Sequence, residues 1–241
     1  MEQILAAVGV HKRFGALVVL DGVDFAVAER EAVGIVGPNG AGKTTLLNVL
    51  AGSLRPGAGR VELGGEEVTK LGAAERCRRG LGRAHQVPRP FSGMTVFENV
   101  YVGASTGGRR RGAEAYDRSI EAVELCGLAD RANRRAETLG LLDRKRLELA
   151  RALATDPHVL LLDEIGGGLT DAEAIELVAT VKELRARGLA VVWIEHIVHV
   201  LVQVVDRLIC MDSGRVIADG NPHEVMRDAR VVDAYLGTAA A

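Results

Sequence analysis

Eight consecutive residues, Gly37-Pro38-Asn39-Gly40-Ala41-Gly42-Lys43-Thr44, fit the phosphate-loop pattern GxxxxGK[ST], and Thr45 continues the loop. Glycines in such a loop let successive backbone N–H groups turn inward around phosphate oxygens, beside the positive end of the helix that follows. Lys43 supplies a positive charge for the β- and γ-phosphates, and Thr44 supplies a hydroxyl for Mg²⁺. The segment therefore predicts a site for a nucleoside triphosphate with its Mg²⁺.

A second segment, Leu160-Leu161-Leu162-Asp163-Glu164, delivers two carboxylates at the end of an apolar run. Open α/β sheets bind their ligands outside the carboxyl ends of the strands, so we expect these carboxylates beside the phosphate loop. Asp163 is expected to hold Mg²⁺ through a water molecule, and Glu164 to polarise the water that attacks the nucleotide. Together the two segments indicate a nucleotide hydrolase.

Other classes of phosphate-loop enzyme fit the sequence less well. Asp163-Glu164-Ile165-Gly166 matches the DxxG pattern of GTPases, but no NKxD motif for guanine follows. Small-molecule kinases do not require the further features described below. ATP is therefore the expected nucleotide.

Three short apolar runs predict the buried strands that position these residues. Residues 32–36 lead into the phosphate loop, residues 159–162 lead into Asp163, and residues 189–194 form a third run. Helical patterns lie between the runs. Strands that alternate with helices predict an α/β fold around a mainly parallel sheet.

The clearest helix is expected over residues 171–187. Thr170 and Glu173 form a capping box at its start, and Gly188 follows its end as a C-cap. Its apolar positions recur at near-helical spacing and predict the buried face, which consists of Ile175, Val178, Val181 and Leu184.

The stretch from about residue 90 to 137 shows helical patterns and no convincing strand. Tyr116, Ile120 and Val123 predict one helical stripe. Residues 107–112, with three arginines, predict a solvated turn between helices. We therefore expect a single domain over residues 1–241, with a helical subdomain inserted at about 90–150.

Composition limits the function classes open to this chain of 241 residues. Apolar residues make up 48% of it, which is enough for a sizeable core. A net charge of −2 and a share of only 3% aromatic residues argue against nucleic acid as a partner. Cys77, Cys126 and Cys210 are scattered, as expected of buried thiols in a reducing compartment.

Two further features bear on location. The N-terminus, Met1-Glu2-Gln3-Ile4, is charged early and lacks the apolar region of a signal peptide. The most apolar stretch, residues 189–211, is interrupted by Glu195, His196 and Asp206 among others, which argues against a membrane span. We expect a cytoplasmic protein.

Three further segments lie where one family of phosphate-loop enzymes carries functional residues. They are His11-Lys12-Arg13-Phe14-Gly15 near the N-terminus, Arg83-Ala84-His85-Gln86 before the helical stretch, and Glu195-His196 after the third strand. With the phosphate loop, they make the chain resemble the ATPases of ABC transporters from end to end. The resemblance implies a P-loop NTPase core with an antiparallel β region near the N-terminus and an inserted helical subdomain.

The resemblance also implies a role for each segment. Phe14 would stack on adenine through its ring. Gln86 would contact Mg²⁺ or the attacking water, and its loop would touch the membrane partner. His196 would contact the γ-phosphate as the switch histidine. The expected catalytic residues are thus Glu164, His196 and Gln86, and the expected metal ligands are Thr44, Gln86 and Asp163.

Within the family, the chain resembles the ATPases of branched-chain amino-acid importers. The resemblance is clearest in residues 94–103, residues 147–157 and the tail Val232-Asp233-Ala234-Tyr235-Leu236-Gly237. It implies transmembrane permease subunits as partners and a place on the inner face of the cell membrane.

Two alternatives stay open. One is a soluble ABC ATPase of DNA repair or translation, although the chain has neither two ATPase halves nor a long coiled coil, and the other is a nucleotide-dependent regulator.

One segment departs from the family pattern. The signature LSGGQ or LSYGQ is replaced by Leu139-Gly140-Leu141-Leu142-Asp143, which lacks the serine hydroxyl and places Leu142 where a glycine permits close approach. Ile165 replaces the usual proline, and Thr170 stands at the usual D-loop aspartate. Such a segment should contact a facing γ-phosphate poorly, so we expect a heterodimer with a second ATPase subunit whose signature is intact. We also expect Asp143 to bring negative charge near that phosphate unless it turns away to cap the following helix.

Overall fold

The computed structural model describes residues 2–236, so Met1 and Gly237, at the ends of two segments discussed above, lie outside the described residues. A six-stranded sheet forms its centre, in the order β10-β9-β3-β8-β7-β6. The β9–β10 pair is antiparallel, and the other four pairs are parallel. The strands are β3 (Ala32–Val36), β6 (Leu81–Ala84), β7 (Val159–Asp163), β8 (Ala190–Ile194), β9 (Arg207–Asp212) and β10 (Arg215–Gly220).

The three predicted strands are confirmed. Strand β3 spans the predicted residues, β7 adds Asp163 to the predicted run, and β8 begins at Ala190, one residue later than predicted. Every residue of these three strands is buried, because the sheet is covered on both faces. The mainly parallel α/β fold is therefore confirmed.

Alternate residues of these strands enter two separate hydrophobic cores. Leu161 and Val192 belong to the core that also contains the apolar face of α1 (Lys43–Leu50). Leu160 and Trp193 belong to the core beneath the helices of the opposite face. Because side chains alternate along a strand, Asp163 shares the α1 face with Leu161.

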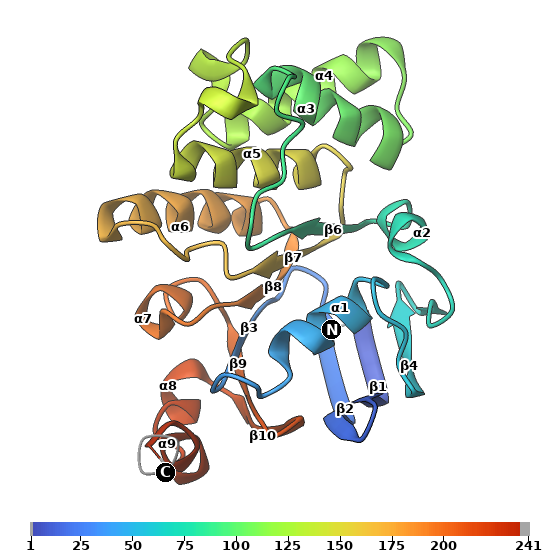
Figure 1. Ribbon diagram of the computed structural model, residues 1–241, viewed down its shortest axis with the longest axis vertical. Coiled ribbons are helices and arrows are strands. Elements are labelled where there is room, and N and C mark those ends of the chain that lie inside the picture. The colour runs from blue at the N-terminus through green and yellow to red at the C-terminus, as the bar shows by residue number, and fades with distance from the viewer. Residues whose placement is uncertain (1, 237–241) are drawn as a thin grey trace.

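A second, antiparallel sheet has the strand order β2-β1-β4-β5 and lies beside α1 (Figure 1). It confirms the expected antiparallel region near the N-terminus. Its apolar side chains, such as Leu5, Leu20 and Val61, join Leu46 and Leu47 of α1 in one core. The strands are β1 (Gln3–Phe14), β2 (Leu17–Ala28), β4 (Ala58–Leu63) and β5 (Glu66–Glu67).

The carbonyl end of α1 is closed by Arg76, from the short helix α2 (Ala73–Cys77). This side chain is fully buried, and its guanidinium donates to the carbonyls of Val49 and Leu50, both at 2.7 Å. Burial lowers the pKa of Arg76 to about 10, so the group stays charged at neutral pH. A cation at a helix C-terminus is stabilising, and here it holds the helix that follows the phosphate loop.

Helices α3, α4 and α5 pack on one another at one end of the molecule, next to α6 (Figure 1). They lie in the stretch for which a helical subdomain is predicted, although its boundaries stay a prediction. A π-helical turn, Gly103–Gly107, continues α3. The helices are α3 (Val96–Val102), α4 (Gly112–Leu125), α5 (Leu141–Leu153) and α6 (Asp171–Ala186), with 3₁₀ turns at Ala129–Arg131 and Ala136–Thr138.

Two of the predicted apolar stripes are partly wrong. In α4, Tyr116 is exposed and Ile120 is half-buried, and in α6, Ile175 is 65% exposed. Mostly small side chains form the buried face of α4, and they allow the close approach of α5, which longer side chains would prevent. The buried positions of α4 are Ala115, Ser119, Ala122 and Val123, and those of α6 are Ala174, Leu177, Val178, Val181 and Leu184.

The arginine-rich turn before α4 is held more firmly than predicted. Arg110 pairs with Glu114 and with Asp156, and only 26% of its side chain is exposed. The second of these pairs joins the turn to the segment between α5 and β7. One of the three arginines therefore anchors the turn, so a solvated turn is an incomplete description.

The predicted capping box of α6 is confirmed, and the C-cap lies one residue before the predicted Gly188. The Thr170 hydroxyl accepts from the Glu173 N–H, and the Glu173 carboxylate accepts from the Thr170 N–H at 2.8 Å. Gly188 follows the last turn with a φ of +91°, one residue beyond Arg187, which is the C-cap. Both ends of the helix after β7 are thereby defined by local sequence.

Three short helices complete the chain: α7 (Val198–Leu201), α8 (Pro222–Val225) and α9 (Ala229–Leu236). Among residues 2–236, no helix combines the length and apolarity needed to cross a bilayer. Cys126 and Cys210 are buried as predicted, whereas Cys77 is half-buried, and all three are free thiols.

Candidate nucleotide-binding site

The predicted site residues follow the carboxyl ends of four adjacent parallel strands. The phosphate loop follows β3, Glu164 follows β7, His196 comes shortly after β8, and Gln86 comes shortly after β6. The register pairs Asp163 with Ile194 across the β7–β8 ladder. The sheet therefore gathers residues from distant parts of the chain at one edge.

The backbone of the phosphate loop requires glycine at positions 37 and 42. Gly37 and Gly42 have φ angles of +143° and +100°. A Cβ at Gly37 would lie 2.0 Å from the Met211 carbonyl oxygen, and one at Gly42 would lie 2.6 Å from that of Val19. The loop thus presents bare backbone at the start of α1, where N–H groups can surround an anion.

The loop borders a cavity of about 190 Å³. Glu164 and His196 line it from the facing strand ends, and Val19 lines it from β2. Thr44 is exposed at the start of α1, so its hydroxyl is accessible. The predicted loop residues that line the cavity are Asn39, Gly40, Ala41, Gly42, Lys43, Thr44 and Thr45.

Lys43 is the buried cation of this cavity. Its ammonium group donates to the carbonyls of Gly37 at 2.7 Å and Pro38 at 3.0 Å. Burial lowers the pKa of Lys43, and the negative charge of Glu164 partly opposes that shift. An ammonium group has three donors, so these two bonds hold the charge over the loop and leave one donor for a phosphate oxygen.

Glu164 lies between two of the other predicted catalytic residues. Nε2 of His196 is 2.7 Å from one carboxylate oxygen, and the Gln86 amide donates to the other. The backbone of Glu164 is left-handed, with a φ of +47°, which costs about 1–3 kcal/mol for a residue with a side chain. Its N–H donates to the Ile194 carbonyl at 2.9 Å, which holds this conformation in place. The structure therefore brings all three residues together beside the phosphate loop.

The two carboxylate oxygens of Asp163 differ in their surroundings. Oδ2 accepts a hydrogen bond from Arg83 at 2.7 Å, whereas Oδ1 is buried and has no hydrogen-bond partner among residues 2–236. A buried acceptor without a donor is costly unless a ligand satisfies it. The described residues contain no cluster of three or more acidic, histidine or cysteine side chains that could hold a metal ion. Mg²⁺ does not require such a cluster, because it binds one or two carboxylates together with phosphate oxygens and water. The site therefore fits Mg²⁺ that arrives with a nucleotide.

Phe14 stands apart from the cavity. It ends β1, its side chain is 51% exposed, and the Lys12 ammonium lies 5.4 Å from the centre of its ring. Neither Phe14 nor Gln86 is among the residues that line the cavity of the loop. The structure therefore leaves Phe14 half exposed, with Lys12 over its ring, and does not place it in the wall of the phosphate-loop cavity.

Two residues of the site, Arg83 and Glu195, were not predicted from the sequence. Arg83 is the ion-pair partner of Asp163. Glu195 is buried, and its carboxylate accepts from the N–H groups of Gly166 at 2.7 Å and His196 at 3.0 Å. Burial raises the pKa of Glu195, although both of these bonds oppose the shift. Both residues carry a charge within or directly after a buried strand. A buried charge requires a partner, so this position in the sequence could have indicated that Arg83 and Glu195 belong to the site.

The altered signature is partly helical, and its acid is turned away. Helix α5 begins at Leu141, with Gly140 as the N-cap, so Asp143 does not cap the helix. Its carboxylate instead pairs with Arg131 at 2.8 Å and Arg146 at 3.7 Å. Leu141 remains 44% exposed. The surface that this segment offers to a facing chain is therefore apolar rather than acidic.

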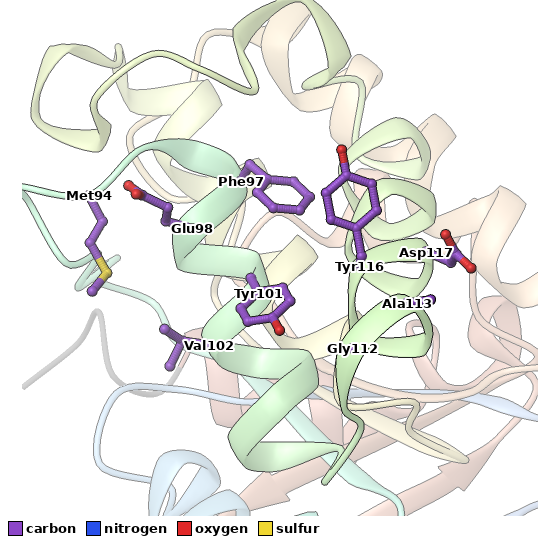
Figure 2. A pocket seen from close by; sticks show the side chains of 9 residues that line it. All are labelled: Met94, Phe97, Glu98, Tyr101, Val102, Gly112, Ala113, Tyr116 and Asp117. Atoms are coloured by element: carbon purple, nitrogen blue, oxygen red, sulfur yellow. The ribbon is translucent and has the colours of Figure 1, made fainter.

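A separate pocket of about 730 Å³ opens between α3 and α4 (Figure 2). Phe97 lines it, with the ring centres of Tyr116 and Tyr101 at 5.0 Å and 6.1 Å from its own. Met94 adds an exposed apolar side chain, and Glu98 and Asp117 add two carboxylates. An exposed aromatic pocket with acidic side chains is typical of an interaction surface.

The parallel sheet, the phosphate loop and the carboxylates at its edge define a phosphate-loop nucleotide hydrolase. Residues 20–166 match the ABC transporter family, and residues 215–241 match a family described as branched-chain amino acid ATP-binding cassette transporter. The chain therefore belongs to the ABC transporter family, as one of its ATPases.

Similar proteins cover nearly the whole chain. It is 36% identical to the high-affinity branched-chain amino acid transport ATP-binding protein LivG of Salmonella typhimurium, over 99% of each chain. It is 35% identical to the corresponding protein BraF of Pseudomonas aeruginosa, over 98% of each. A crystal structure of an ABC transporter cassette in its ADP conformation superimposes with a TM-score of 0.90 and 31% identity, over 98% of this chain and all of the other.

Replacing Lys43 tests the phosphate loop. We expect Lys43→Ala to weaken ATP binding by roughly 10- to 100-fold, the equivalent of losing one hydrogen bond to a charged group. Isothermal titration with ATP would measure the change. The matched control is Lys182→Ala, at an exposed position on α6, which should bind ATP like the parent chain. Equal affinities for the two variants would contradict the assignment of the site.

Proposed function

We propose that this chain binds ATP with Mg²⁺ and hydrolyses it to energise an importer of branched-chain amino acids. The observation that carries the hydrolytic part is the position of Glu164 between Gln86 and His196, beside the phosphate loop. The proposed cargo rests on the match of residues 215–241 and on the names of the relatives. On this proposal, the chain works on the inner face of the cell membrane, held there by permease subunits.

Each side chain has a defined task in this proposal. Lys43 holds the β- and γ-phosphates, and Glu164 accepts a proton from the attacking water while Gln86 and His196 fix its carboxylate. Thr44, Gln86 and Asp163 would hold Mg²⁺, which neutralises developing charge on the phosphates when it is bound. Phe14 would stack on the adenine ring, as the family resemblance implies, and its exposure at the end of β1 is compatible with this role.

Glu164→Gln tests the hydrolytic role. The amide keeps the size of the side chain but cannot accept the proton, so turnover should fall by roughly a hundredfold or more while ATP binding survives. Phosphate release by the complex assembled with its permease measures turnover. Glu173→Gln is the control, since glutamine also serves in a capping box. Parental turnover in Glu164→Gln would place the catalytic base elsewhere.

We further propose that the pocket between α3 and α4 receives a permease subunit. The segment that begins with Gln86 ends at Met94, in the wall of the pocket, and Phe91 of that segment packs under the Arg151 guanidinium of α5 at 4.9 Å. A contact in the pocket would therefore reach the nucleotide site through one short segment. The expected occupant carries apolar side chains for Phe97 and a basic one for the acidic rim.

Tyr116→Glu tests this surface. The side chain is 51% exposed, so the fold should tolerate the change, whereas a buried carboxylate in a filled pocket would be costly. We expect co-purification with the permease to be lost and ATP binding by the isolated chain to be retained. Ile175→Glu, at a 65% exposed apolar position on α6, should leave co-purification intact. Retained co-purification of Tyr116→Glu would exclude the pocket.

We propose, finally, that the chain works beside a second ATPase subunit with an intact signature. ATPases of this kind place the phosphate loop of one chain against the signature of the other. Here the signature offers Leu141 and Leu142 and no serine hydroxyl, and Asp143 is engaged by Arg131 and Arg146. Such a surface has few donors for a phosphate, so one of the two sites of the heterodimer would be weak.

Size-exclusion chromatography of Glu164→Gln with ATP and Mg²⁺ tests the asymmetric arrangement. Without a partner, we expect the chain to remain monomeric. Adding Gly140→Ser and Leu142→Gly supplies a hydroxyl and removes the bulky side chain, and should increase the fraction of ATP-dependent dimer. A stable ATP-dependent homodimer of the chain with its own signature would contradict the proposal.

A further inference from the structure

Arg83 bridges two elements of the nucleotide site. It lies on β6, opposite Leu161 of β7, and its side chain is only 11% exposed. One terminal nitrogen donates to Oδ2 of Asp163, and the other donates to Oδ1 of Asn48 on α1, both at 2.7 Å. The guanidinium therefore joins the helix after the phosphate loop to the carboxylate at the end of β7.

This contact fixes the orientation of the Asp163 carboxylate. One oxygen, Oδ2, is held by Arg83, so turning the carboxylate out of this orientation costs a charge-assisted hydrogen bond. Oδ1 is consequently the oxygen that stays without a partner in the described structure. Without the guanidinium, Oδ2 would also lack a donor, and the carboxylate would be free to turn away from the site.

We propose that Arg83 is a positioning residue for Mg²⁺, which reserves Oδ1 of Asp163 for the ion or its bound water. The inference rests on the proposed binding of ATP with Mg²⁺ and extends it to a residue that does not touch the ion. Residues that orient metal ligands in this way typically affect metal affinity by roughly 10- to 100-fold.

Two effects of Arg83 oppose each other, and they predict opposite results. As a positive charge beside Asp163, it repels a cation, so its removal would tighten Mg²⁺ binding. As the partner that orients the carboxylate, it favours the ion, so its removal would weaken Mg²⁺ binding. The guanidinium makes two fixed hydrogen bonds to two different elements, and this geometry can hold the Asp163 carboxylate in one orientation. We therefore expect that removing Arg83 weakens Mg²⁺ binding.

Asn48 offers an independent way to disturb the same arrangement. Asn48→Ala removes one anchor of the guanidinium but leaves both its charge and Asp163 in place. Arg83→Lys keeps the charge and loses the fork, because an ammonium group cannot match the planar pair of donors. The charge effect predicts no change in either variant, whereas the positioning role predicts weaker Mg²⁺ binding in both.

The test measures Mn²⁺ as a stand-in for Mg²⁺ on the full-length, ADP-saturated chain, through the electron paramagnetic resonance signal of the free ion. We expect Arg83→Gln to weaken Mn²⁺ binding by roughly tenfold or more, with smaller losses in Arg83→Lys and Asn48→Ala. The affinity for ADP in the presence of EDTA should stay at the parental value. Arg118→Gln is the control, since Arg118 is also a mostly buried ion-paired arginine but lies on α4, so its Mn²⁺ affinity should not change.

The outcomes separate this inference from the function on which it rests. A parent chain that binds Mn²⁺ no better than free ADP does would overturn the proposed metal site itself. If the parent chain binds Mn²⁺ tightly and the Arg83→Gln variant binds it equally well or better, only the positioning role would be overturned. If Arg83→Gln does not fold, Asn48→Ala decides the matter, and parental Mn²⁺ affinity in that variant would contradict the inference.

Discussion

The buried parallel ladder that joins β3, β8, β7 and β6 is the constraint on which the site depends. Its hydrogen bonds pair Ile35 with Ile194, and Ile194 with Asp163, so the strand ends are aligned to within a residue. A slip of one residue in β7 would move Asp163 to the opposite face of the sheet, away from α1. Two complete cores, one on each face, oppose such a slip, because every side chain of the strand would exchange its surroundings.

Hydrogen bonds between the loops at this edge of the sheet offset backbone strain and buried charge. The left-handed backbone of Glu164 and the buried carboxylate of Glu195 both cost free energy. The bond from Glu164 N–H to Ile194 and the bonds that Glu195 accepts from Gly166 and His196 offset these costs. Hydrogen bonds thus tie the loops after β7 and β8 to each other, and they hold Glu164 and His196 within 2.7 Å of each other.

Sequence was sufficient for features that depend on local pattern. An apolar run predicted the strand before the phosphate loop, and the spacing of Thr170 and Glu173 predicted the capping box of α6. The family resemblance predicted that Gln86, Glu164 and His196 belong to one site. Contacts between distant elements could not be predicted, because no pattern in β6 shows that Arg83 reaches both Asp163 and Asn48. The stripe of Tyr116, Ile120 and Val123 was partly wrong for a related reason, since helical period alone does not decide which face packs against α5.

Helix α5 shows how one chain can combine the altered signature with a nucleotide site of its own. At its start, Asp143 is used for ion pairs within the chain, and this stabilises the helix whatever faces it. Two residues later, Lys145 is buried and donates to the Gln86 carbonyl at 3.4 Å, so the same helix supports the segment that carries Gln86. The two functions of α5 occupy different faces. The changed residues 139–142 therefore do not disturb the contact of Lys145 with the segment that carries Gln86, which is compatible with the proposed pairing with a different ATPase subunit.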